Sequence, residues 1–141
     1  MRRAGQTVPA LPIMPDQAIR VLRARLILEE ATETIEALGC EVVMNDGELS
    51  VRNDFLKQPS ILETIDGCCD LSVVTIGTLS ALGCPDAPFL AEVDAANLRK
   101  FEGDAHRDSH GKWIKPSDFV GPDIEGRLAE VRGLKSANVL H

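Results

Sequence analysis

ILEEATETIEALG, residues 27–39, decides the fold because it carries carboxylates along an apolar helical stripe. At about 100° per residue on an ideal helix, Glu30 and Glu33 fall within about 60° of the apolar positions on one face. The members of this stripe are Ile19, Leu22, Leu26, Glu30, Glu33 and Ala37. The pattern predicts a helix that directs two carboxylates toward its neighbours.

A second stretch, ETIDGCCDLSVV at residues 63–74, has the same character. Glu63, Asp66 and Asp70 fall within about 60° of one another on a helix whose other sides are apolar. Buried carboxylates cost several kcal/mol each unless a partner neutralises them, and neither stretch offers an inward Lys or Arg at a matching position. Oxygen ligands without His or Cys suit Mg²⁺ or Mn²⁺. The alternative interpretation is a solvated acidic face.

Composition limits the function classes. The chain has 141 residues, the length of one domain, and a formal net charge of −7, which argues against nucleic-acid backbone binding. No apolar run approaches the roughly 18 residues of a membrane span, and Pro9, Pro12 and Pro15 interrupt any signal-peptide core. We therefore expect a cytoplasmic protein without a membrane or nucleic-acid partner. The four cysteines show no CxxC spacing, and we expect them to be reduced and buried.

Periodicity and turn residues predict an all-α helical bundle with a small β-hairpin insertion, organised as an N-terminal arm (1–15), a domain (16–132) and a C-terminal tail (133–141). Two of the helices are apolar on more faces than the other helices of one chain can cover, so we expect a homodimer or a homotetramer to complete the bundle. The predicted elements are helices at 16–38, 60–82, 88–102 and 124–131, a hairpin around Asn45, Asp46 and Gly47, and a long loop at 103–122.

Four segments, in this order, resemble the all-α nucleoside triphosphate pyrophosphohydrolases, the superfamily of MazG, dimeric dUTPases and phosphoribosyl-ATP pyrophosphatase. RLILEEATETIEAL resembles the family's EExxE helix, and IDGCCDLSVVTIGTLSALG resembles its second acidic helix. EVDAANLRKF is similar to the family's N-x-x-K segment. HGKWIKPSDFVGPDI resembles the tail of the proteins in the subgroup related to phosphoribosyl-ATP pyrophosphatase. The chain departs from the family's ExxD motif because Gly67 stands three positions before Asp70. The ligand set of the second helix thus stays open among Glu63, Asp66 and Asp70.

The resemblance implies hydrolysis between the α and β phosphates of a nucleoside triphosphate, giving a monophosphate and pyrophosphate. It also implies roles for individual residues. Glu30, Glu33, Asp66 and Asp70, with Glu63 as a further candidate, would hold Mg²⁺, and Glu29 would be a further ligand or the base for the attacking water. Asn97, Lys100, Lys112 and Lys115 would contact the substrate.

Other functions fit parts of the pattern. Phosphoribosyl-ATP is an alternative substrate. A bundle without catalytic activity that binds a nucleotide or a protein is an alternative of another class. A di-iron bundle needs Glu-x-x-His on its helices, whereas His106, His110 and His141 lie outside the predicted helices.

Overall fold

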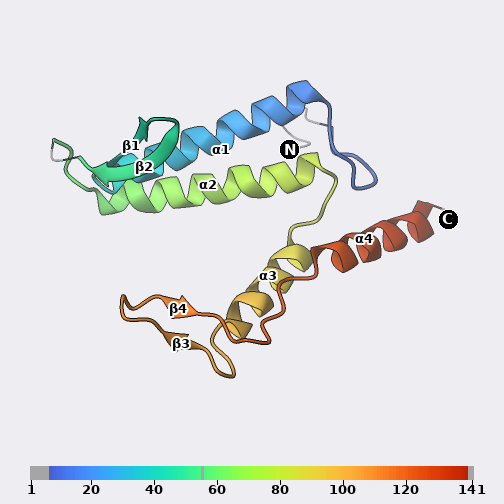
Figure 1. Cartoon of the computed structure of the whole chain (residues 1–141). Coiled ribbons are helices and arrows are strands. Elements are labelled where there is room, and N and C mark those ends of the chain that lie inside the picture. Colours follow the sequence, from blue (N-terminus) through green and yellow to red (C-terminus); the bar gives the residue numbers. More distant parts are fainter. Residues whose placement is uncertain (1–6, 55, 140–141) are drawn as a thin grey trace. The chain divides into compact units, whose positions relative to one another are not determined.

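The computed structural model describes residues 7–54 and 56–139, with side chains described as far as residue 133. Residues 1–6 of the predicted arm and 140–141 of the predicted tail lie outside this description. The described chain forms two compact units, one built on residues 14–82 and one on residues 83–139 together with Pro9–Ile13. It is mostly helical, with four helices among the described residues (Figure 1). None of the helices in the described part of the chain is both long enough and apolar enough to cross a membrane.

The first unit begins with helix α1, Gln17–Ala37, which confirms the prediction for 16–38. The Asp16 side chain caps the helix by accepting a hydrogen bond from the Ile19 backbone N–H at 2.9 Å. After the last turn the chain reverses at Gly39, whose φ of 74° lies in the left-handed region that glycine adopts without strain.

A hairpin follows, made of β1, Cys40–Asn45, and β2, Glu48–Asn53, paired antiparallel. Its two-residue turn holds Asp46 at a φ of 51° and Gly47 at 83°. Positive φ at both central positions is typical of a type I′ turn, for which Asp-Gly is a favoured pair. The predicted hairpin is confirmed.

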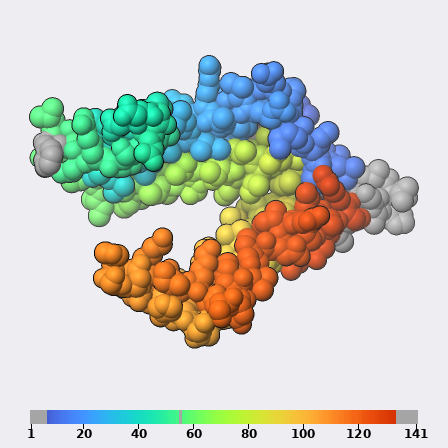
Figure 2. Space-filling model, viewed as in Figure 1, coloured from blue at the N-terminus to red at the C-terminus, as the bar shows by residue number. Residues whose placement is uncertain are grey.

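Helix α2, Ile61–Ala81, begins at Ser60, whose hydroxyl caps the Glu63 N–H at 3.3 Å. It packs antiparallel along α1, since Thr34 meets Gly67 while Arg23 meets Gly77. The space-filling view shows the two helices in contact along their length (Figure 2). A Cβ at Gly67 would lie 2.6 Å from Thr34 Oγ1 and 3.2 Å from Thr34 Cα. Only glycine therefore permits this approach of the two helices.

We predict that Gly67→Ala lowers the stability of the protein by about 1–3 kcal/mol, the usual cost of overpacking. Alanine favours helices over glycine by up to about 1 kcal/mol, so the loss would arise from packing against Thr34. The matched control is Gly133→Ala in helix α4, where an added Cβ has open space. Chemical denaturation of both variants checks this, and a Gly67→Ala protein as stable as the control would show that the helices do not pack so closely.

The second unit contains α3, Ala87–Arg99, the two-residue strands β3, His106–Arg107, and β4, Trp113–Ile114, and α4, Ile124–Val139. Glu92 of α3 joins it to α4: it accepts a hydrogen bond from the Asp123 N–H at 3.0 Å and contacts the guanidinium groups of Arg127 and Arg99. The backbone bond from Asp123, followed by the bond from Arg127, lowers the pKa of Glu92.

Three predictions for this unit need correction. Helix α3 ends three residues earlier than expected, and α4 continues past 131 to Val139. The segment 103–122, predicted to be a loop, contains the β3–β4 pair. Asp108 forms the turn by accepting hydrogen bonds from the backbone N–H groups of His110 and Lys112, both at 2.9 Å, and Phe101 packs edge-on against Trp113. Strands of two residues are too short to give a periodic signal.

All four cysteines are free thiols. Cys68 and Cys69 are exposed, and Cys40 and Cys84 are only partly covered, so the prediction that they are buried is wrong. Cys68 and Cys69 are exposed because α1 covers the side of α2 that carries Gly67 and Gly77 and leaves the side with these cysteines uncovered.

Candidate metal centre

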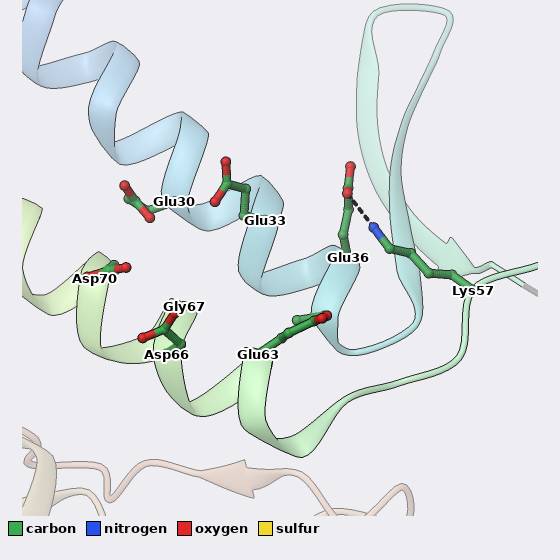
Figure 3. A pocket seen from close by; sticks show the side chains of 9 residues that line it. Glu30, Glu33, Glu36, Lys57, Glu63, Asp66, Gly67 and Asp70 are labelled. Carbon is green, nitrogen blue, oxygen red and sulfur yellow. Dashed lines mark hydrogen bonds and ion pairs between the residues drawn. The ribbon is translucent and has the colours of Figure 1, made fainter.

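A pocket of about 240 Å³ lies between the C-terminal half of α1 and the N-terminal half of α2. The contact of Thr34 with Gly67 sets the register, so that Glu30 and Asp70 come together one turn away (Figure 3). The pocket thus collects carboxylates from both acidic stretches. Its lining residues are Glu30, Glu33, Glu36, Ala37, Lys57, Glu63, Asp66, Gly67 and Asp70.

Glu30 is the electrostatic centre of this pocket. Its pKa is raised above the usual value for a glutamate, first by desolvation and then by the negative charges of Asp70, Glu33, Glu29 and Asp66. The four nearby carboxylates come from both helices, which shows that the two acidic stretches act on one another. A proton or a cation would relieve this repulsion.

The structure corrects the prediction that these carboxylates are buried. Glu30 is half-buried, whereas Glu33, Glu63, Asp66 and Asp70 are exposed. In the first unit the described helices are α1 and α2, and two helices flank the carboxylates without enclosing them. Acidic side chains at the helix seam here line an open groove.

Sequence analysis did not identify two cationic side chains near the contact between α1 and α2. Lys57 Nζ lies 2.5 Å from Glu36 Oε2 at one end of the pocket. Arg23 is 7% exposed and points from α1 into the contact with α2, contrary to the expectation that no inward Arg is present. Its hydrogen bonds go to Val74 and Thr78, and Lys57 pairs with a glutamate that was not a candidate ligand. Neither of these two cations forms an ion pair with a candidate ligand.

The donor chemistry fits a hard divalent cation. Five carboxylates line the pocket at the candidate positions Glu30, Glu33, Glu63, Asp66 and Asp70, and oxygen-only donors suit Mg²⁺ or Mn²⁺. Within the residues that the structure describes, no group of three or more His, Cys, Asp or Glu side chains is placed to hold a metal ion as it stands. Binding would therefore require rotamer changes, which exposed carboxylates undergo readily.

Among the other candidates, Glu29 is exposed and does not line the pocket, although its charge contributes to the raised pKa of Glu30. It lies next to the pocket rather than within it. Glu36 lines the pocket but was not predicted. Its signal in the sequence is its position three residues after Glu33, on the same helical face.

The four predicted substrate residues belong to the second unit. Lys100 Nζ donates a hydrogen bond to Asn97 Oδ1 at 2.6 Å, as expected for neighbours on one helical stripe. Lys115 Nζ lies 4.8 Å from the centre of the Phe119 ring, and Lys112 is exposed in the β3–β4 turn. Their contact with substrate stays a prediction.

Comparison of the chain with models of known protein families gives no match, and a search of curated proteins finds no similar sequence.

Glu30→Gln provides a test of the pocket's electrostatics. Because the folded protein raises the pKa of Glu30, the ionised form destabilises the fold, and the wild type loses stability as the pH rises through that pKa. In metal-free buffer we expect Glu30→Gln to melt at a higher temperature than the wild type at neutral pH. This difference should shrink as the pH is lowered and Glu30 takes up a proton.

The control for this comparison is Glu48→Gln on the exposed β2 strand. Melting curves between pH 4 and pH 8 in a chelating buffer measure both differences. A Glu30→Gln gain that does not vary with pH, or a loss of stability at neutral pH, would contradict the assignment of repulsion to Glu30.

Proposed function

We propose that the protein is a Mg²⁺-dependent nucleoside triphosphate pyrophosphohydrolase of the all-α, MazG-like class. The reaction is hydrolysis between the α and β phosphates of a ribo- or deoxyribonucleoside triphosphate, giving the monophosphate and pyrophosphate. The observation that supports this most strongly is the joining of the two acidic stretches, which are about 30 residues apart, in one pocket around Glu30. The resemblance of the EExxE helix and the second acidic helix to that class points to the same residues.

In this proposal the carboxylates of Glu30, Glu33, Asp66 and Asp70 hold the cation, with Glu63 at the N-terminal end of α2 as a further ligand. Mg²⁺, or Mn²⁺ in its place, supplies charge neutralisation for the phosphate oxygens. The carboxylates provide several negative charges without a strong nucleophile, which favours direct attack by water over a covalent intermediate. Glu29, beside the pocket, accepts the proton of that water or adds a ligand.

The proposal keeps the substrate contacts that the resemblance implies for four residues of the second unit. Lys100 and Asn97 form a donor and acceptor pair suited to a phosphate and to a base or sugar. Lys112 and Lys115 present ammonium groups near the β3–β4 turn that suit a triphosphate.

A second copy of the chain belongs to the proposed active form. The flank of α2 carries a shallow groove whose walls include Leu62 and Ile65, which are 78% and 57% exposed. The same groove includes Glu63 and Asp66, so a partner seated there would cover the carboxylates as well as the apolar side chains. We therefore propose that the helical bundle is completed in a homodimer, or in a homotetramer formed by two such dimers.

Incubation with a panel of ribo- and deoxyribonucleoside triphosphates, with and without Mg²⁺, tests the proposed activity. Chromatography of the nucleotides should show a monophosphate formed from at least one substrate, with no diphosphate intermediate, and only when Mg²⁺ is present. Phosphoribosyl-ATP belongs in the panel because residues 110–124 resemble the tail of the subgroup related to phosphoribosyl-ATP pyrophosphatase. Lack of turnover of every compound in the panel would contradict the proposed activity and would favour the alternative of a bundle without catalytic activity.

A further inference from the structure

A second pocket opens along the same helix pair, at the end of α2 away from the acidic residues. It has a volume of about 380 Å³. Its one charged lining group is Arg23, which reaches it from α1 with 7% of its surface exposed. The remaining lining residues are Val73, Val74, Ile76, Gly77 and Ser80.

The guanidinium of Arg23 is fixed in orientation by α2. Nε donates to Thr78 Oγ1 at 3.1 Å, and Nη2 donates to the Val74 carbonyl at 2.6 Å. The Thr78 hydroxyl donates to the same carbonyl at 2.8 Å, which closes the network. Gly77 makes room for it, because a Cβ there would lie 2.5 Å from Nη2. These hydrogen bonds hold the edge of the guanidinium formed by Nε and Nη2. The edge that includes Nη1 is not held by α2.

Nη1 makes no hydrogen bond to any described residue. Among these residues no side-chain nitrogen or oxygen that is sealed from solvent lacks a partner. Nη1 is therefore accessible to solvent, and Arg23 lines the pocket. No described Asp or Glu forms an ion pair with Arg23.

A largely buried cation without a counter-charge is costly, and an anion that binds its free edge recovers part of that cost. The planar guanidinium edge suits two oxygens of a phosphoryl group better than a single acceptor does. The exposed side chains of Val73 and Ile76 flank the pocket with apolar surface, which strengthens such a charge-assisted bond by displacing water.

We propose that this pocket is a phosphoryl-binding subsite in which Arg23 is the anchoring residue and the Ser80 hydroxyl is a second donor. Arg23 lies seven residues from Glu30, or about 10 Å along α1. If the proposed function holds, a triphosphate bound at the carboxylates extends along the helix pair toward Arg23. The subsite then binds a phosphoryl group that lies away from the acidic pocket. The affinity for a phosphoryl group itself does not depend on that function.

The test uses the full-length protein with inorganic phosphate in metal-free buffer, where the acidic pocket has no cation to recruit an anion. Nitrogen NMR of the arginine side chains should show a saturable shift of the Arg23 Nε–H resonance. Sodium chloride at matched ionic strength, and the resonance of the exposed Arg25, report non-specific screening. A shift of Arg23 no larger than that of Arg25, or one reproduced by chloride, overturns the proposal.

Arg23→Gln removes the anchor but also breaks the bonds to α2, so a second variant is needed. Ile76→Glu leaves Arg23 in place and adds a carboxylate at the pocket wall, where it should compete with phosphate. We expect it to weaken phosphate binding at least about tenfold, the loss expected when a competing charge occupies a guanidinium. Ile61→Glu adds the same charge on α2 outside the pocket and should leave binding within about twofold of the wild type. Equal binding by the two variants overturns the proposal.

Inorganic pyrophosphate and a non-hydrolysable triphosphate, each with and without Mg²⁺, identify the source of the phosphoryl group. If Mg²⁺ enhances the binding of these compounds and Ile76→Glu weakens it, the result supports one polyphosphate group that contacts both this pocket and the acidic pocket. Metal-independent phosphate binding that Ile76→Glu weakens supports the subsite even if no triphosphate is hydrolysed, so this result and a failure of the proposed enzyme activity are distinguishable.

Discussion

Asp70→Asn and Glu33→Gln are each expected to reduce pyrophosphate release by about a hundred- to a thousandfold, the rate equivalent of the several kcal/mol that a catalytic cation supplies. Both residues line the pocket, and the negative charge of each raises the pKa of Glu30. Removing either charge takes away a proposed ligand, and it also relieves repulsion that the metal-free protein carries. We therefore expect both variants to be folded and as stable as, or more stable than, the wild type without metal.

Melting temperatures measured with and without Mg²⁺ show whether Asp70 and Glu33 are metal ligands or have only a structural role. A cation that binds the folded state stabilises it, so the wild type should melt higher with Mg²⁺, and the increase should shrink in both variants. Glu48→Gln, which lies on the hairpin strand β2, is the charge-matched control and should retain activity and the full response to Mg²⁺. Retained turnover in Asp70→Asn would show that this carboxylate does not hold the catalytic cation.

A second large effect is expected on the oligomeric state of the protein. We expect the protein to sediment at micromolar concentration as a dimer or tetramer, with a mass at least twice that of the 15.3 kDa chain. Ile65→Glu, in the groove on the flank of α2, should shift the protein to monomer, because it buries a charge in the proposed interface. Glu63 and Asp66 lie in the same groove, so the monomer should also lose pyrophosphate release.

Leu49→Glu provides the control for the assembly experiment. Leu49 is 65% exposed on β2, away from the groove, and its replacement should leave the oligomeric state unchanged. A wild-type protein that sediments as a folded monomer at micromolar concentration would exclude the dimer, and an Ile65→Glu protein that stays assembled would place the interface elsewhere.

The local elements of the first unit were predictable because their signals lie within a few residues. Asp16 caps α1, Gly39 ends it, and Asp46 with Gly47 forms the hairpin turn, each through a backbone preference that sequence neighbours do not alter. The acidic residues of the site were also found in the sequence, since their spacing places them on one face of each helix. What the spacing could not show was how exposed they are, because exposure depends on how many helices surround the groove.

The contact between the helices was predicted less well. The apolar stripe placed Leu22 and Leu26 at the interface, whereas Leu22 is 42% exposed and the most buried residues of α1 include Arg23 and Thr34. Both are polar, and each packs against a glycine of α2 that is far away in the sequence. A search for apolar periodicity gives no weight to such residues, since it takes no account of the room that Gly67 and Gly77 provide.

The fate of the γ phosphate distinguishes the proposed reaction from removal of the terminal phosphate alone. A triphosphate labelled in its γ phosphate is incubated with the protein and Mg²⁺, with no added pyrophosphatase, and the products are resolved by ion exchange. Attack by water that separates the α and β phosphates leaves the label in pyrophosphate, and we expect pyrophosphate to be the first labelled product. Label that appears first in orthophosphate, together with a nucleoside diphosphate, would show that the protein does not cleave between the α and β phosphates.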